Sequence, residues 1–70
     1  MNTKELKIQM IRENKTVNQL CEAIGICRSA WFRKVSGKSQ FTQGEISKLR
    51  FELDLDDQMT GIIFFDRQVS

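Results

Sequence analysis

The sequence predicts an all-α fold, in which four or five short helices form a compact bundle within a single domain, residues 1–70. The chain contains no proline, and residues that favour helix N-termini recur before short segments with apolar positions. Within those segments the apolar residues are spaced by three and four positions, which is the period of a helix with one buried face. A short C-terminal strand or an extended tail is the open alternative at the end of the chain.

The first predicted helix runs from about Thr3 to Asn14. Asn2 precedes it as an N-cap, with Glu5 three residues later, as in a capping signal. The apolar residues of this segment are expected on one side of the helix: Leu6, Met10 and, less regularly, Ile11.

The second and third predicted helices are separated by a glycine turn. Thr16 and Gln19 have the types and spacing of a capping box, in which each side chain satisfies the other residue's backbone N–H. The helix that they open stops at Gly25, because glycine tolerates the left-handed backbone that follows a helix end. A further helical run, from Arg28 to Ser36, is closed in the same way by Gly37.

The fourth predicted helix begins with another capping box, formed by Thr42 and Glu45, and Phe41 precedes it as a hydrophobic staple. Gly44 in the first turn lowers the stability of this helix by up to about 1 kcal/mol relative to alanine. The apolar residues that follow keep the helical spacing: Ile46, Leu49 and Leu53.

The C-terminal segment is dense in apolar residues. A fifth short helix is predicted to start at residues 56–57, where negative charge favours a helix N-terminus, and Gly61 interrupts it. Residues 62–65 are too few to assign by period, so they form either a last helical turn or a strand. Part of this segment must close the core, and we expect the remainder of 56–66 to form a dimer interface. The expected interface residues are Met59, Ile62, Ile63, Phe64 and Phe65.

Size and composition restrict the other properties of the chain. A domain of this length buries only roughly 60% of its unfolded surface, so self-association is expected to support a marginal core. With two cysteines and no histidine, a four-ligand zinc site would need aspartate or glutamate to complete it, and the spacing of Cys21 and Cys27 does not suggest one. We therefore expect neither a metal nor another cofactor. The N-terminus lacks the apolar core of a signal peptide or anchor, which predicts a cytoplasmic protein with free thiols and no membrane partner. Cys27 is interpreted as a small turn residue rather than a redox switch.

The net charge of +2 is mild but unevenly distributed. Between residues 28 and 50 a single acidic residue, Glu45, accompanies six basic residues: Arg28, Arg33, Lys34, Lys38, Lys48 and Arg50. From residue 51 onward a single basic residue, Arg67, accompanies five acidic residues: Glu52, Asp54, Asp56, Asp57 and Asp66. This pattern is explained equally well by ordinary solvated charge and by one surface that faces a polyanion.

Residues 16–37 provide the functional hypothesis. A capped helix, a glycine turn and a second helix closed by glycine form the layout of a helix-turn-helix, whose second helix enters the major groove of DNA. Cys21 is the small residue expected where the two helices cross. Trp31 and Val35 are expected to point toward the core, so the outward side of the second helix presents Arg28, Ser29, Phe32 and Arg33.

The outward residues have the chemistry of base recognition. Arginine binds guanine through two hydrogen bonds, serine bonds several base edges, and an aromatic ring packs on a thymine methyl group. The alternative is that these residues are merely solvated surface. An exposed Phe32 between two arginines is an unfavourable surface residue, which weighs against that alternative.

This region resembles the Cro/CI-type (Xre-like, lambda-repressor-like) helix-turn-helix family. The matching residues are Thr16-x-x-x-Leu20-Cys21-x-x-Ile24-Gly25-Ile26 and Ser29-Ala30-Trp31-Phe32-Arg33-Lys34-Val35-Ser36-Gly37-Lys38. The remainder looks like short phage and prophage members of the group, from Phe41-Thr42-x-x-Glu45-Ile46 through Ile63-Phe64-Phe65. The resemblance implies a compact lambda-repressor-like bundle, binding to an operator in double-stranded DNA, and a two-fold dimer.

The resemblance also implies which residues meet which part of the DNA. Bases would be contacted by Arg28, Ser29, Phe32 and Arg33, as the geometry above already indicates. Phosphates would lie near Val17, Asn18, Lys34, Ser36, Lys38, Ser39 and Thr42. The chain departs from the family in having Cys21 where alanine is common, Asn14-Lys15 before the capping threonine, and Lys34 where an aliphatic residue is usual. The last departure is expected to shift the core contact to Val35.

The leading hypothesis is therefore a sequence-specific regulator of transcription, a repressor or Cro-like protein of a phage or prophage. The alternative is a protein-interaction module of the same fold, which acts as an antirepressor or modulator by binding another phage regulator. The mild net charge and the acidic, apolar C-terminus leave room for it. No acid–base or nucleophile pair is present in a chain without histidine, so we do not expect an enzyme.

Overall fold

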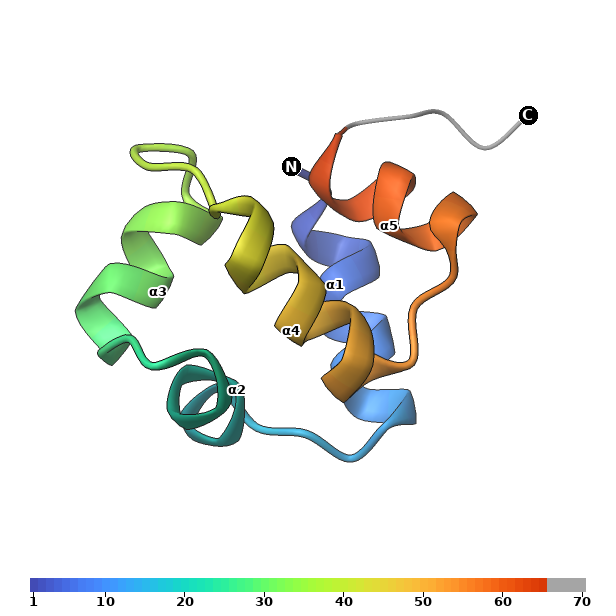
Figure 1. Cartoon of the computed structure of the whole chain (residues 1–70), viewed down its shortest axis with the longest axis horizontal. Coiled ribbons are helices and arrows are strands. Elements are labelled where there is room, and N and C mark those ends of the chain that lie inside the picture. Colours follow the sequence, from blue (N-terminus) through green and yellow to red (C-terminus); the bar gives the residue numbers. More distant parts are fainter. Residues whose placement is uncertain (66–70) are drawn as a thin grey trace.

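Five α-helices form the part of the chain that the computed structural model describes, residues 1–65 (Figure 1). They are α1 (Thr3–Arg12), α2 (Val17–Ile24), α3 (Arg28–Val35), α4 (Gln43–Leu53) and α5 (Asp57–Phe64). The all-α fold is thereby confirmed. No helix within these residues is both long and apolar enough to cross a membrane.

Side chains at four helix starts satisfy backbone N–H groups that have no acceptor within the helix. At α2, the Thr16 hydroxyl accepts the N–H of Gln19 at 3.2 Å, and the Gln19 side chain accepts the N–H of Thr16 at 2.8 Å. Thr42 and Glu45 form the same reciprocal box at α4. Single hydrogen bonds cap α1 and α5, and their acceptors are the side chains of Asn2 and Asp56. These contacts confirm the helix starts that the sequence predicts.

Left-handed residues end or separate the helices. Gly25 has a φ of 78° and Gly37 a φ of 90°, as the sequence predicts for glycine beyond a helix end. Asn14 and Asp54 also have positive φ, 55° and 51°, without a glycine to mark the position. Asparagine and aspartate tolerate this conformation better than other residues with a side chain.

The core lies around α4, which runs through the middle of the molecule in Figure 1. α2 packs against both α3 and α4, while α1 packs against α5. Buried apolar side chains come from all five helices, among them Leu6, Leu20, Ile24, Trp31, Leu49, Leu53 and Ile63. The two halves of the chain therefore share one core, to which residues 16–37 contribute buried side chains.

The apolar side of α1 differs from the predicted one. Ile11 is 78% exposed, while Gln9 is buried beside Leu6 and Met10 packs against the core. At about 100° per residue, position 9 lies roughly 60° from position 6 around the helix, and position 11 lies roughly 140° away. Ile11 therefore could not share a face with Leu6, and its assignment to that side is wrong.

α5 also corrects an expectation. The helix continues through Gly61 to Phe64, so Gly61 does not interrupt it and a strand is wrong for residues 62–64. Burial explains this result. A helical glycine costs about 1 kcal/mol relative to alanine, whereas burying each of Ile62 and Ile63 contributes roughly 1.5–3 kcal/mol. The predicted extended tail, and residue 66 of the predicted dimer segment, lie outside the described residues.

Candidate nucleic-acid interface

The turn between α2 and α3 is held by the backbone of Cys21. Its carbonyl oxygen accepts the N–H of Gly25 at 2.8 Å and the N–H of Ile26 at 3.0 Å, which closes the C-terminus of α2. The Cys21 side chain is buried in the core, and α2 contacts α3. Cys21 is therefore a small buried residue of a helix that packs against α3, while its place at the helix crossing stays a prediction.

The inward side of α3 is formed by Trp31. Its side chain is 2% exposed, and its ring meets the edge of Phe41 with 5.5 Å between centroids. Phe41 makes a similar edge contact with Phe64 of α5, at 5.6 Å. Val35 is partly buried against the same core. Trp31 thus connects α3 to α5 through Phe41 of the loop before α4, and each pair of rings has a favourable edge-to-face geometry.

The outward side of α3 presents the side chains that the sequence predicts to contact bases. Arg28, Ser29, Phe32 and Arg33 are all exposed. Phe32 is 51% exposed, and the guanidinium of Arg28 lies 5.7 Å from the centroid of its ring, within cation–π range. The division of α3 into an inward Trp31 and this outward group agrees with the prediction, while contact with DNA stays a prediction.

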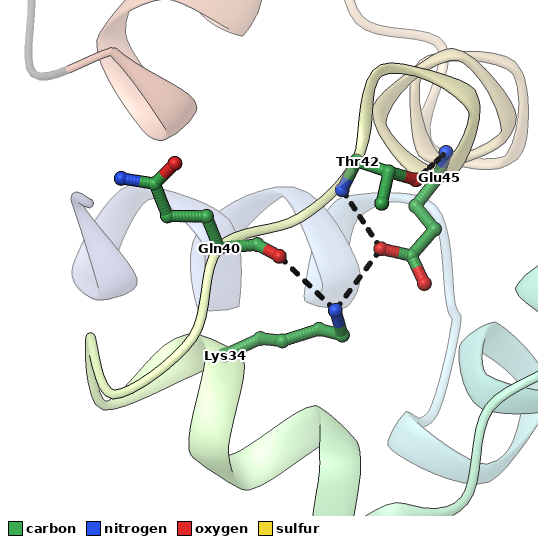
Figure 2. A network of polar contacts seen from close by, with 4 residues as sticks. All are labelled: Lys34, Gln40, Thr42 and Glu45. Carbon is green, nitrogen blue, oxygen red and sulfur yellow. Dashed lines mark hydrogen bonds and ion pairs between the residues drawn. The ribbon is translucent and has the colours of Figure 1, made fainter.

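Lys34 does not belong to the outward side. Its side chain is only 14% exposed, and its ammonium group lies 3.2 Å from Oε1 of Glu45 and 3.0 Å from the carbonyl oxygen of Gln40 (Figure 2). It also lies 5.7 Å from the centroid of the Phe41 ring. The Lys34 ammonium therefore faces partners within the protein, and Lys34 is not among the phosphate contacts that we propose.

The other residues predicted to contact phosphate lie on two segments. They are Val17 and Asn18 at the start of α2, and Ser36, Lys38, Ser39 and Thr42 between the end of α3 and the start of α4. Val17 packs partly buried against the core, so only its backbone can meet a phosphate. The remaining five are exposed, but the Ser36 hydroxyl already donates to the carbonyl oxygen of Arg33 at 3.0 Å. Nothing in the structure tests their contact with DNA.

Ion pairs leave part of the basic segment without an acidic partner. Lys34 pairs with Glu45, and Arg50 pairs with Asp57 at 2.6 Å, so the acidic end of the chain neutralises part of the basic segment. Within residues 1–65, no ion pair is formed by Arg28, Arg33, Lys38 or Lys48. Two of these free cations lie on α3 and a third follows it, which concentrates unpaired positive charge around the outward side of α3.

The predicted dimer residues divide between the core and the surface. Ile62 and Ile63 are buried, and Met59 and Phe64 pack partly buried against the core. Phe65 is 59% exposed. The segment therefore closes the core of one chain first, and Phe65 is the member with the largest exposed fraction.

The two cysteines are free and differ in environment. Burial raises the pKa of the Cys21 thiol. Cys27 is exposed at the start of α3, where the backbone N–H of Ala30 stabilises the thiolate and lowers its pKa. No three histidine, cysteine or acidic side chains gather as a metal site within residues 1–65.

The pairing of Lys34 with Glu45 was missed from the sequence. The sequence predicts only the capping box for Glu45, yet the same oxygen that accepts the N–H of Thr42 also lies 3.2 Å from the Lys34 ammonium. Burial by itself raises the pKa of Glu45, but the Thr42 N–H and the Lys34 ammonium outweigh it, so the pKa is lowered. The signal was a lysine at a position where the resemblance places an aliphatic residue.

Comparison with protein-family models, with curated proteins and with solved structures finds no match for this chain. The functional proposal therefore depends on the geometry of the interface itself.

Proposed function

We propose that the chain is a sequence-specific regulator of transcription that inserts α3 into the major groove of double-stranded DNA. The observation that supports this most strongly is the outward side of α3. In the proposal, α3 is the second helix of a helix-turn-helix whose turn contains Gly25, and buried Trp31 fixes its inward side. The side chains that it exposes are Arg28, Ser29, Phe32 and Arg33.

Each of these side chains has a distinct role in the proposal. Arg28 and Arg33 read guanine through paired hydrogen bonds, and Ser29 bonds a neighbouring base edge. Phe32 packs on a thymine methyl group and also restrains Arg28 through the cation–π contact at 5.7 Å. A restrained arginine loses less side-chain entropy on binding than a freely rotating one.

Phosphate contacts supply affinity rather than specificity. In the proposal, Lys38 neutralises phosphate next to α3, and Asn18, Ser39 and Thr42 donate hydrogen bonds to the DNA backbone. Ser36 is left out because its hydroxyl and its backbone N–H already donate to the carbonyl oxygens of Arg33 and Phe32. Binding is therefore expected to weaken steeply as salt rises, because each neutralised phosphate releases counterions.

A two-fold dimer would place two copies of α3 about one DNA turn apart and recognise a near-palindrome. We propose Phe65 as its principal apolar contact, with the exposed parts of Met59 and Phe64 beside it. Sedimentation equilibrium of the chain and of Phe65→Ser tests this: the variant should shift toward monomer. Equal association constants would refute the assignment.

Selection of bound sequences from random duplex DNA is the test of the proposal, and failure to enrich any sequence would refute it. On the enriched duplex, Arg28→Ala and Arg33→Ala should each weaken binding by about 1–3 kcal/mol and relax the preference at one base position. Arg12→Ala is the matched control, because Arg12 is an exposed arginine on α1, outside the helix-turn-helix. It should leave the base preference unchanged.

A second candidate function is favoured by a different observation. Phe51 of α4 is 84% exposed, and aromatic residues are enriched at protein interfaces relative to the rest of the surface. A module that binds another regulator would use this surface. Titration with regulators encoded beside it distinguishes the two functions: Phe51→Ser would abolish such a complex and leave DNA binding intact.

A further inference from the structure

We infer that the Lys34–Glu45 ion pair positions the phosphate-facing loop, residues 36–42, relative to the recognition helix. This inference rests on the proposed function, in which Lys38, Ser39 and Thr42 meet the DNA backbone. Lys34 and Glu45 are thus positioning residues that touch no DNA themselves.

The two halves of the loop are held in different ways. The first half is tied to the end of α3 by its own backbone: the N–H groups of Lys38 and Ser39 both donate to the carbonyl oxygen of Arg33, at 3.0 and 3.3 Å. The second half is tied by side chains, since the Lys34 ammonium binds the carbonyl oxygen of Gln40 and Glu45 binds the N–H of Thr42. Figure 2 shows these contacts converging between α3 and α4.

A single carboxylate oxygen joins the two helices. Oε1 of Glu45 lies 2.8 Å from the backbone nitrogen of Thr42 and 3.2 Å from the ammonium nitrogen of Lys34. The cap of α4 is therefore bonded to the last turn of α3, and the loop between them has fixed ends. Phe41 lies within the same loop, with the Lys34 ammonium 5.7 Å from its ring centroid.

Global stability does not explain a lysine at this place. Its side chain is 14% exposed and that of Glu45 is 15% exposed, so both charges are partly removed from water. Partly buried ion pairs often contribute no more than apolar side chains of similar size, because desolvation offsets the attraction. An apolar side chain could also pack on Phe41, but it could not bond Gln40 and Glu45. The pair therefore fixes one loop conformation.

The expected consequence is selective. If the ion pair is removed, the loop loosens and its phosphate contacts weaken together, while the outward side chains of α3 keep their place because Trp31 anchors them. Affinity and salt dependence should fall, and base preference should not change. A residue that merely stabilises the fold would not separate these properties.

The test compares Lys34→Met and Glu45→Gln with Arg50→Met. Methionine keeps the apolar stem of Lys34, and glutamine can still cap α4 by accepting the N–H of Thr42. Arg50→Met is the matched control, since it also removes one positive charge and one ion pair, the pair with Asp57. Two measurements are made: binding to the duplex enriched by selection at several salt concentrations, and amide hydrogen exchange of residues 37–41 without DNA.

Lys34→Met and Glu45→Gln should each weaken binding roughly tenfold and lower the salt slope by up to about 1, the contribution of Lys38, with the same preferred sequence. Exchange at residues 37–41 should accelerate in both variants and not in Arg50→Met. If the amide exchange rates of residues 37–41 in all three variants equal those of the unmodified chain, the inference is overturned. If the unmodified chain enriches no duplex, the proposed function fails, and the exchange rates still decide whether the ion pair holds the loop.

Discussion

Trp31 and Phe32 are adjacent in sequence and about 100° apart around α3, but one is buried and the other exposed. Truncating each in turn therefore tests the orientation of the recognition helix. Trp31 is 2% exposed and Phe32 is 51% exposed. Truncating a buried aromatic residue to alanine costs about 3–5 kcal/mol. A domain of this size has a total stability of only about 4–10 kcal/mol, so Trp31→Ala should remove a large share of it.

Phe32→Ala should cost much less. An aromatic side chain buries roughly 150–250 Å² when fully covered, so half burial at about 25 cal/mol per Å² gives at most about 2–3 kcal/mol. The real cost is smaller, because alanine keeps the β-carbon and the unfolded chain is partly compact. We expect about 1 kcal/mol for Phe32→Ala, with a loss of DNA affinity that its effect on stability does not explain.

Urea unfolding followed by far-ultraviolet circular dichroism measures both variants. Fluorescence is unsuitable because Trp31 is the only tryptophan. The urea concentration at the unfolding midpoint should fall much further for Trp31→Ala than for Phe32→Ala. If both variants unfold in two states, the slope of the free energy of unfolding against urea concentration should be similar. A Phe32→Ala variant destabilised as much as Trp31→Ala would refute the orientation of α3, and the proposed base contacts with it.

Three further predictions follow from particular contacts. Gly25→Ala should lower the free energy of unfolding by about 1–2 kcal/mol, because the φ of 78° there is unfavourable for alanine. Gly44→Ala should raise it by up to about 1 kcal/mol, because alanine favours the helix and its β-carbon would meet nothing within 4 Å. Unfolding temperatures that shift in the same direction in both variants would contradict this. The lowered pKa of Glu45 contributes stability above the pKa of the unfolded chain, which is lost as pH falls through the native pKa. In urea unfolding, Glu45→Gln should therefore be less stable than the unmodified chain at about pH 7, and this difference in the free energy of unfolding should shrink as the pH is lowered. A difference that does not depend on pH would count against the pairing. Iodoacetamide should modify Cys27 in the native protein but Cys21 only in urea, because Cys27 is exposed and its pKa is lowered, while Cys21 is buried. Equal labelling of the two cysteines in the native protein, measured by mass spectrometry, would be inconsistent with these environments.

Local interactions explain how much of the fold could be predicted. A capping box forms between residues three apart, so Thr16 with Gln19 and Thr42 with Glu45 were visible in the sequence as helix starts. A glycine beyond a helix end meets a requirement of the backbone alone, which is why Gly25 was identified as the turn of the helix-turn-helix.

Helical geometry determined the outward side of α3 in the same way. Once the large apolar Trp31 was placed inward, the period of the helix put Ser29 and Arg33 roughly 160° away and Phe32 roughly 100° away. Arg28 lies only roughly 60° from Trp31, and its exposure goes with its place as the first residue of α3. The side that each residue faces needed no knowledge of the other helices. What these residues bind is a separate question, which the experiments above address.

Only tertiary packing decided the remaining features. α5 continues through Gly61 because the burial of Ile62 and Ile63 outweighs the cost of a helical glycine, and no local pattern shows which side chains the core will cover. The same limit applies to Lys34. Its sequence position allows an outward side chain, but α4 brings Glu45 to within 3.2 Å of it. An attraction between charges on different helices depends on a distance that exists only once the chain has folded.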